Sequence, residues 1–420
     1  MRGILTPDYS PRIRFSTVLS MGLFVVFSLV EVDLTSGDSP PPQQQLKAYA
    51  LRGSPNSADI SPDEQFVVTE STVKNNGVDP GTNTFAEVVR AWNFRESTLM
   101  GEFVAQRTDV RADAKGAFAD PVPGPRYVRF SPDGRVVAAL VNRTIHVLSA
   151  KDLTELRTIP LVGPSNTTHT FRGTTFVSEP DVRAAEISPN GNVIAILWVS
   201  DLLYGRVELY DLSSGTNIQS WDTPIGWIQF TKDLVWRSDG KLLFLAIPNE
   251  TPCSAPSGQP DVFAFDVRTG AVAQRFTTGL LAGSVAIGTN SNVLAVDLNC
   301  LGVFKNHDPK LRVFDLTTGK HLRDVSGRGA GVRYWVSASA DGSRFLAFTG
   351  KMKAKFDLSD GVPYDSSVDE TFSVWNLKTY EGIVTSQNIP GLKNSVLRLS
   401  SKGRYAVSYG KASFVYELPQ

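Results

Sequence analysis

Residues 127–149 read YVRFSPDGRVVAALVNRTIHVLS, and this stretch decides the fold. An apolar strand leads into the tight turn at 131–134, a second apolar strand follows, and a third strand alternates apolar and polar residues. Ser, Pro, Asp and Gly favour turns because they supply side-chain hydrogen bonds, a fixed φ or a positive φ. The stretch and the residues after it predict four strands, a to d, at Tyr127 to Ser131, Val136 to Val141, Thr144 to Ser149 and Leu156 to Val162.

The same unit occurs seven times along the chain. Its turn lies at 61–64, 131–134, 188–191, 237–240, 288–292, 339–342 and 400–403. Its third strand ends in an aromatic residue followed by Asp, Asn or Glu at Trp92-Asn93, Tyr210-Asp211, Phe265-Asp266, Phe314-Asp315, Trp375-Asn376 and Tyr416-Glu417, with Leu148-Ser149 as a degenerate copy. Repeated four-stranded units arranged radially make a β-propeller, so the sequence predicts an all-β protein with seven blades.

The last repeat stops after its third strand, FVYEL at 414–418, and only Pro419 and Gln420 follow. The sequence LKAYALR at 46–52 alternates like a strand and has no partner of its own. An unpaired strand edge is a liability that closure removes, so we expect residues 46–52 to complete the last blade. An eighth blade would need a further repeat, and the sequence between the seven units contains none.

The turn and the aromatic-acidic pair resemble the WD40-like propeller superfamily over residues 46–420. Two features depart from that family: no Gly-His dipeptide precedes a first strand, and no third strand ends in a Trp-Asp pair. The hydrogen-bond network of Asp, His, Ser or Thr, and Trp that is typical of the family is therefore not expected. The repeat also looks like quinoprotein, lactonase and sugar-acting propellers, which hold metal or cofactor ligands around the central channel.

The composition favours no charged ligand. The chain of 420 residues has 41% hydrophobic residues, 42 basic and 42 acidic side chains. Nucleic-acid-binding proteins present an excess of basic residues, so no nucleic-acid partner is expected.

The N-terminus has the pattern of an export signal. Arg12 and Arg14 precede an apolar stretch at 15–30, and a Pro/Gln-rich segment follows. We expect residues 1–37 to be a signal peptide or an uncleaved signal anchor, and residues 38–45 to be a linker. Both alternatives place the propeller at 46–420 outside the cytoplasm, and the second attaches it to a membrane.

The connections between strands b and c, and between d and the next a, vary widely in length and emerge on one face of a propeller. Binding residues usually lie on such loops, so a protein partner is expected there. The longest b-to-c insertion is in the sixth blade, and its candidate binding residues are Lys351, Lys353, Lys355, Asp357, Asp360, Tyr364, Asp365, Asp369 and Glu370. Cys253 and Cys300 fall in the b-to-c loops of adjacent blades, where an oxidising compartment would favour a disulfide between them.

Evidence for chemistry is weak. The four histidines, His146, His169, His307 and His321, lack the paired spacing of metal ligands. The acidic residues of the sixth-blade loop lack the spacing of a calcium loop, and no hydrolase or nucleotide-binding motif occurs. A non-enzymatic scaffold without cofactor or metal is the favoured interpretation, and a propeller enzyme or a protein with a small ligand in its channel is the alternative.

Overall fold

The structure is a computed structural model that describes residues 46–76, 82–111, 127–171, 174–178, 180–200, 204–224, 226, 231, 233–247, 259–278, 282–288, 292–298, 310–326, 332–352, 355–356, 363–364, 367–387, 396–410 and 413–420. All of them belong to one compact unit that begins at Asp38. The expected signal and linker lie outside the described residues. No helix long and apolar enough to cross a membrane occurs in the part of the chain described.

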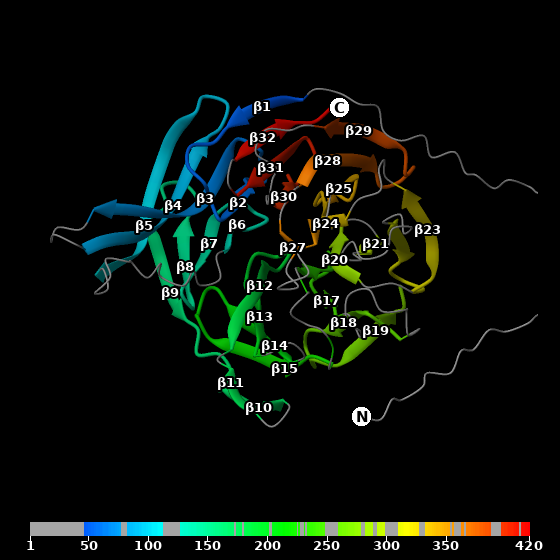
Figure 1. The fold of residues 1–420 in the computed structure, drawn as a ribbon, viewed down its shortest axis with the longest axis horizontal. Coiled ribbons are helices and arrows are strands. Elements are labelled where there is room, and N and C mark those ends of the chain that lie inside the picture. The colour runs from blue at the N-terminus through cyan, green and yellow to red at the C-terminus, as the bar shows by residue number, and fades with distance from the viewer. Residues whose placement is uncertain are drawn as a thin grey trace, which may run out of the picture. The chain divides into compact units, whose positions relative to one another are not determined.

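Seven antiparallel four-stranded sheets form a ring (Figure 1). Blade 1 contains β2 Ser57–Ile60, β3 Phe66–Asn76, β4 Thr82–Asn93 and β5 Thr98–Arg111. Blade 2 contains β6 Tyr127–Phe130, β7 Val136–Val141, β8 Thr144–Ser149 and β9 Glu155–Pro160. Blade 3 contains β12 Asp181–Ile187, β13 Val193–Val199, β14 Gly205–Asp211 and β15 Asn217–Asp222. Blade 4 contains β16 Leu234–Trp236, β17 Leu242–Ala246, β18 Val262–Asp266 and β19 Val272–Phe276. Blade 5 contains β20 Ala282–Ile287, β21 Val293–Leu298, β22 Lys310–Asp315 and β23 His321–Ser326. Blade 6 contains β24 Val332–Ala338, β25 Arg344–Met352, β28 Ser367–Asn376 and β29 Gly382–Gln387.

Blade 7 combines the two ends of the propeller sequence. Its strand order is β1 Lys47–Ala50, β32 Phe414–Glu417, β31 Tyr405–Tyr409 and β30 Val396–Leu399. In the outer pair, Lys47 lies opposite Glu417 and Ala50 lies opposite Phe414. The predicted closure by residues 46–52 and the predicted seven blades are both confirmed (Figure 1).

The hydrophobic core lies between blades. One buried cluster joins blades 2 and 3, with Ile145 and Trp198 both fully buried, and another joins blades 4 and 5 around Phe244. Middle strands are therefore apolar at almost every position, because both of their faces pack against a neighbouring blade. The outer strand of blade 2 is mostly exposed and ends at Pro160, two residues earlier than expected, with Val162 85% exposed.

The repeated turn has a common hydrogen-bond pattern. In blade 2, Ser131 Oγ donates to Asp133 Oδ1 at 2.6 Å, Val136 N donates to Ser131 Oγ at 3.1 Å, and Gly134 N donates to Ser131 O at 2.8 Å. Gly134 has φ +70°, a conformation that glycine adopts at no steric cost. Ser188 and Ser339 make the same bonds in blades 3 and 6, with Asn190 and Asp341 as acceptors. These bonds explain why Ser, Asp or Asn, and Gly recur at fixed positions.

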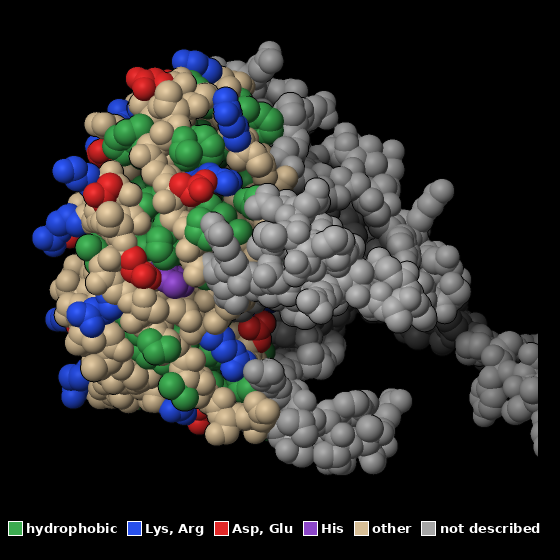
Figure 2. Space-filling view, turned by 90° about the vertical axis from the view of Figure 1, so that its left-hand side faces the viewer, with side chains coloured by type: hydrophobic (Ala, Val, Ile, Leu, Met, Phe, Trp, Pro, Cys, Tyr) green, Lys and Arg blue, Asp and Glu red, His purple; other side chains and the backbone are tan. Residues whose placement is uncertain are grey.

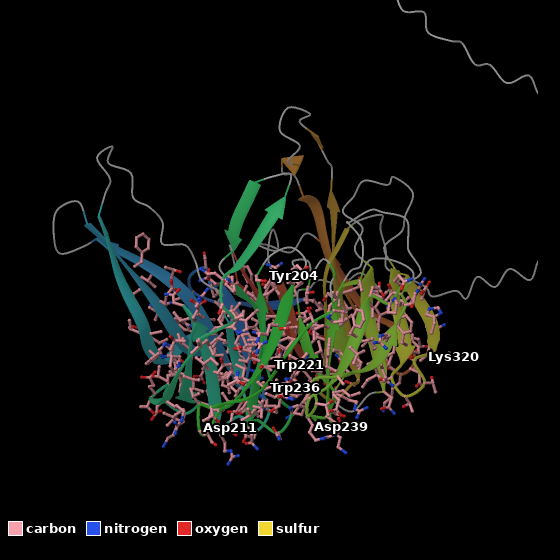
Figure 3. All side chains as sticks on the ribbon, turned by 90° about the horizontal axis from the view of Figure 1, so that it is seen from below. Tyr204, Asp211, Trp221, Trp236, Asp239 and Lys320 are labelled. Atoms are coloured by element: carbon pink, nitrogen blue, oxygen red, sulfur yellow. The ribbon has the colours of Figure 1, made fainter. Side chains whose placement is uncertain are left out.

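In the described part of the chain, three structures extend beyond the basic blades on the face of the b-to-c and d-to-a connections. The hairpin of β10 Thr167–Phe171 and β11 Thr174–Ser178 lies between blades 2 and 3. The hairpin of β26 Lys355–Phe356 and β27 Pro363–Tyr364 lies within blade 6, and strands β3, β4 and β5 of blade 1 are 11, 12 and 14 residues long. Figure 3 shows these elements rising on the side of Tyr204, away from the turns that hold Asp211 and Asp239.

Candidate functional site

The innermost strands bring one position of every repeat to the central channel. This position lies two residues before the first residue of the tight turn. Its seven occupants, here called the channel layer, are Asp59, Arg129, Glu186, Val235, Ala286, Ser337 and Arg398. Blades 7, 1, 2 and 3 therefore contribute charges of alternating sign, whereas blades 4, 5 and 6 contribute small neutral side chains.

The four charged members form one network. Arg398 Nη2 and Nη1 donate to Glu186 Oε1 and Oε2 at 3.1 and 3.2 Å, and Arg398 Nε lies 3.2 Å from Asp59 Oδ1. Arg129 Nε lies 3.7 Å from Glu186 Oε2, and Arg129 Nη1 donates to Val128 O at 2.8 Å. Arg398 of blade 7 thus reaches Glu186 of blade 3 past two intervening blades. Two arginines balance two carboxylates, so the network is neutral.

Burial and the neighbouring charges shift the pKa values of the groups in this network. Burial raises the pKa of the Asp59 carboxyl, although Arg398 and Arg129 oppose the shift. Burial acts to lower the pKa of Arg398, but the carboxylates of Glu186 and Asp59 raise it above its usual value. Burial also raises the pKa of Tyr127, whose ring lies 4.6 Å from the Arg129 guanidinium. The arginines consequently stay charged, and each is held by acceptors within the chain.

A cavity of about 410 Å³ lies over the channel layer on the face of the tight turns. The second residue of six turns lines it: Pro62, Pro132, Pro189, Ser238, Ala340 and Ser401. On the side of blades 4 to 6 its wall is Val235, Trp236, Ala286, Ile287 and Val336. Trp236 Nε1 donates to Glu186 O at 3.0 Å, which links blade 4 to blade 3.

A second hollow of about 550 Å³ lies between blades 6 and 7 and includes Arg344, Lys402 and Arg404. Arg344 Nη1 donates to Gly403 O at 3.0 Å and to Pro419 O at 2.6 Å. Arg404 Nε lies 2.5 Å from Glu64 Oε2. Arg344 therefore joins blade 6 to blade 7, and Arg404 joins blade 7 to blade 1. Because these two cations already have partners within the chain, the channel cavity is the better candidate for a ligand.

The sixth-blade insertion, predicted as a binding loop, begins as a continued strand pair. In the ladder of β25 and β28, Lys351 lies opposite Asp369 and Gly350 lies opposite Glu370, and in the hairpin Lys355 lies opposite Tyr364. The backbone thus brings two pairs of the predicted residues together. Lys353, Asp357, Asp360 and Asp365 lie outside the described residues, as do Cys253 and Cys300, so the disulfide stays a prediction.

Two of the described histidines, His146 and His321, contact carboxylate side chains. His146 lies in β8, as expected, with Nδ1 2.6 Å from Glu155 Oε1. His321 is the first residue of β23, with Nε2 2.9 Å from Asp324 Oδ1. His169 lies in β10, and His307 is outside the described part of the chain. Among the residues that the structure describes, no group of three or more His, Cys, Asp or Glu side chains is arranged to hold a metal ion.

The described outer edge of blades 1 and 2 has only scattered apolar side chains. Figure 2 shows the side on which blades 1 and 2 lie, with hydrophobic side chains separated by charged and other side chains. Leu99, Met100 and Leu156 are 48%, 52% and 58% exposed there. Scattered apolar side chains of this kind are normal on a soluble surface.

Sequence reasoning missed the charged channel layer. Its signal was a charged residue two positions before the turn in an otherwise apolar strand, as in the motifs ADIS, VRFS, AEIS and LRLS. No protein-family model matches the chain, and no curated protein matches it either. The seven-bladed propeller is the level of classification that the structure supports.

Proposed function

We propose that this chain is a WD40-like propeller, exported or held at a membrane by its N-terminal segment, that binds another protein without catalysing a reaction. The binding surface is the face of the b-to-c and d-to-a connections. The observation that carries the proposal is that the three extensions formed by described residues, in blade 1, between blades 2 and 3, and in blade 6, lie on this one face.

Hairpins suit such a role because their strand edges offer backbone donors and acceptors to a partner strand. Among the strands that the structure describes, sheets β10–β11 and β26–β27 are each two-stranded, and neither has a third strand beside it. The ring beneath them is closed and packed between blades, which gives the extensions a rigid support. On the opposite face most connections are short turns, which leave little room for a variable binding surface.

The channel residues support a non-enzymatic role. A general acid or base must reach a reacting group. Both carboxylates of the channel layer are instead held by arginines of the same chain. The apolar stretch at 15–30 supports export, and the turn and aromatic-acidic signatures support the WD40-like assignment.

The test compares matched variants of the full chain as bait in crosslinking capture from native extract. In one variant a short Gly/Ser link replaces residues 167–178, and in another it replaces residues 353–366. The control, Asp239→Ala, alters the opposite face. A protein that is captured by wild type and the control, is lost from a hairpin variant, and binds again as purified material supports the proposal. Capture that is equal for all baits, or lost only with the control, overturns it.

A further inference from the structure

A buried carboxyl holds the connection between blades 4 and 5. Asp261 directly precedes β18 and is only 4% exposed. Thr278 N donates to Asp261 Oδ1 at 2.9 Å, Thr278 Oγ1 donates to Oδ2, and Ala282 N donates to Oδ2 at 3.3 Å. Thr278 follows the last strand of blade 4, and Ala282 begins the first strand of blade 5. One side chain therefore fixes both ends of this d-to-a connection.

The backbone of Asp261 is held as well. Asp261 N donates to Phe276 O at 3.0 Å, and Ile247 N donates to Asp261 O at 2.8 Å. Thr278, which covers the carboxyl, is fully buried. Because the backbone is fixed within the sheet, the carboxyl reaches water only when the connection moves.

The cation closest to this carboxyl along the hydrogen bonds is already paired. Arg312 Nη1 donates to Thr278 O, on the other side of the connection. Arg312 also binds Asp324, with Nε 2.8 Å from Oδ1 and Nη2 3.2 Å from Oδ2. The same Oδ1 lies 2.9 Å from His321 Nε2. The charge of Arg312 is therefore balanced within blade 5.

Among the described residues, no cation forms an ion pair with the Asp261 carboxylate. At the same ends of the adjacent strands the other charged residues are Arg275 of β19, Asp297 of β21 and Lys310 of β22. Arg275 is exposed and lies opposite Phe263 in its ladder. The donors that hold Asp261 are thus neutral.

Burial without a counter-charge disfavours the ionised carboxyl while the connection is closed. The hydrogen bonds from Thr278 and Ala282 oppose this effect, but burial is larger and raises the pKa of Asp261 to about 6. Once the connection opens, water hydrates the carboxyl, which then titrates near its ordinary value of 3.8. A group whose pKa is higher in the closed form stabilises that form below the lower value, and this stabilisation is lost as the pH rises towards the higher one.

We propose that Asp261 is a pH-dependent latch: the connection between Thr278 and Ala282 closes over the protonated carboxyl and opens more often once the carboxyl is ionised. The latch lies on the face of the d-to-a connections. It requires no partner, so it stands independently of the proposed protein binding. It gives this face a response to acidity.

Native-state hydrogen exchange of the full chain measures this opening. The amides of Thr278 and Ala282 donate directly to the carboxyl, and those of Leu243 and Phe244 in β17 report on the core of blade 4. After correction for the intrinsic pH dependence of exchange, the opening constant at Thr278 and Ala282 should rise about tenfold or more from pH 4 to pH 7. It should also exceed that of the β17 amides at each pH. An opening constant that does not change with pH, or that equals that of the core amides, overturns the proposal.

Two neutral variants assign the response to this carboxyl. Asp261→Asn and Asp261→Ser cannot ionise, so opening at Thr278 and Ala282 should lose its pH dependence in either one. The matched control is Asp266→Asn, at the other end of β18, which should keep the response of wild type. Thermal unfolding checks that each variant is folded, and one folded neutral variant is sufficient. A pH response that persists in a folded neutral variant, or that disappears in the control, refutes the assignment to Asp261.

Discussion

Glu64 of blade 1 supplies the carboxylate that the tight turn of blade 7 lacks. Ser400 Oγ donates to Glu64 Oε1 at 2.6 Å, and Lys402 N donates to the same oxygen at 3.2 Å. In blade 2 an aspartate within the turn, Asp133, accepts both kinds of bond. Blade 7 has Lys402 at that position, and blade 1 has Glu64, with φ +62°, where the other described turns have glycine. Lys402 in place of the turn aspartate of blade 7 and Glu64 in place of the turn glycine of blade 1 therefore compensate each other where these two blades meet.

Replacing Glu64 with Gly should destabilise the propeller by roughly 2–4 kcal/mol, because the buried hydroxyl of Ser400 and the part-buried N–H of Lys402 would lose their acceptor. The loss should occur although glycine relieves the left-handed backbone. Glu64→Gln keeps an acceptor for Ser400 and should cost less. Chemical unfolding monitored by tryptophan fluorescence measures both variants. Equal stability of Glu64→Gly and wild type would show that the bond has no net value.

Tyr49 should contribute measurably to closure. Its hydroxyl donates to Glu417 Oε2 at 3.0 Å, and its ring meets Phe94 edge-on at 5.5 Å. Tyr49→Ala should lower the free energy of unfolding by about 1–3 kcal/mol, since packing and an aromatic contact are lost. Tyr49→Phe should lose only the bond to a half-exposed carboxylate, about 0.5–1 kcal/mol. The order of the two variants in thermal unfolding is the check, and a larger loss for Phe than for Ala would be inconsistent with it.

Arg398 and Glu186 should behave as a coupled pair. Arg398→Met leaves two partly buried carboxylates with fewer counter-charges and should cost roughly 2–4 kcal/mol. Glu186→Gln alone should also destabilise, but the double variant should be less destabilised than the sum, with a coupling of about 1–3 kcal/mol. A double-mutant cycle in urea measures the coupling. Strict additivity would mean that the two side chains do not depend on each other.

Asp261 should make stability fall as pH rises. Burial raises the pKa of its carboxyl to about 6, from an ordinary value of 3.8. Thr278 N donates to Oδ1 at 2.9 Å, and Thr278 Oγ1 donates to Oδ2. Between these two pKa values the folded state keeps a proton that the unfolded state loses. The free energy of unfolding therefore decreases from pH 4 to pH 6, by on the order of 2–3 kcal/mol, and stays constant above.

Asp261→Asn removes this titration and keeps the size of the side chain. From pH 4 to pH 7 the free energy of unfolding of wild type should therefore decrease relative to that of the variant. Urea unfolding at both values measures it. A difference that is constant with pH would show that Asp261 titrates normally in the folded chain.

The blades could be predicted because each one repeats the same local chemistry. The turn at 131–134 and the strands around it specify their own hydrogen bonds, and the apolar pattern specifies stacking on both sides. The pairing of residues 46–52 with 414–418 followed from counting strands. The channel network could not be predicted in the same way, because it joins Asp59, Glu186 and Arg398 from three blades, and only the closed ring brings them together.

The hairpin of β10 and β11 was read only as an insertion, although residues 167–178 alternate around a central Arg-Gly. A short two-stranded hairpin has too little core to be stable by itself, so an alternating sequence of this length predicts a hairpin less firmly than the seven repeats predict the blades. The long strands of blade 1 were missed for a related reason. Residues 74–76 and 82–84 extend the ladder of β3 and β4 with polar residues, which resemble loop sequence.

The side chains of the channel layer determine the chemistry of the channel wall without determining the backbone structure of the ring. Its seven side chains come from equivalent places in seven ladders, and the backbone bonds of those ladders do not depend on which side chain is present. One substitution per blade therefore changes one sector of the channel wall. In this chain blades 4, 5 and 6 carry small neutral side chains at this position, so a substitution there alters the channel wall outside the ion network. A substitution in blade 7, 1, 2 or 3 alters the network as well.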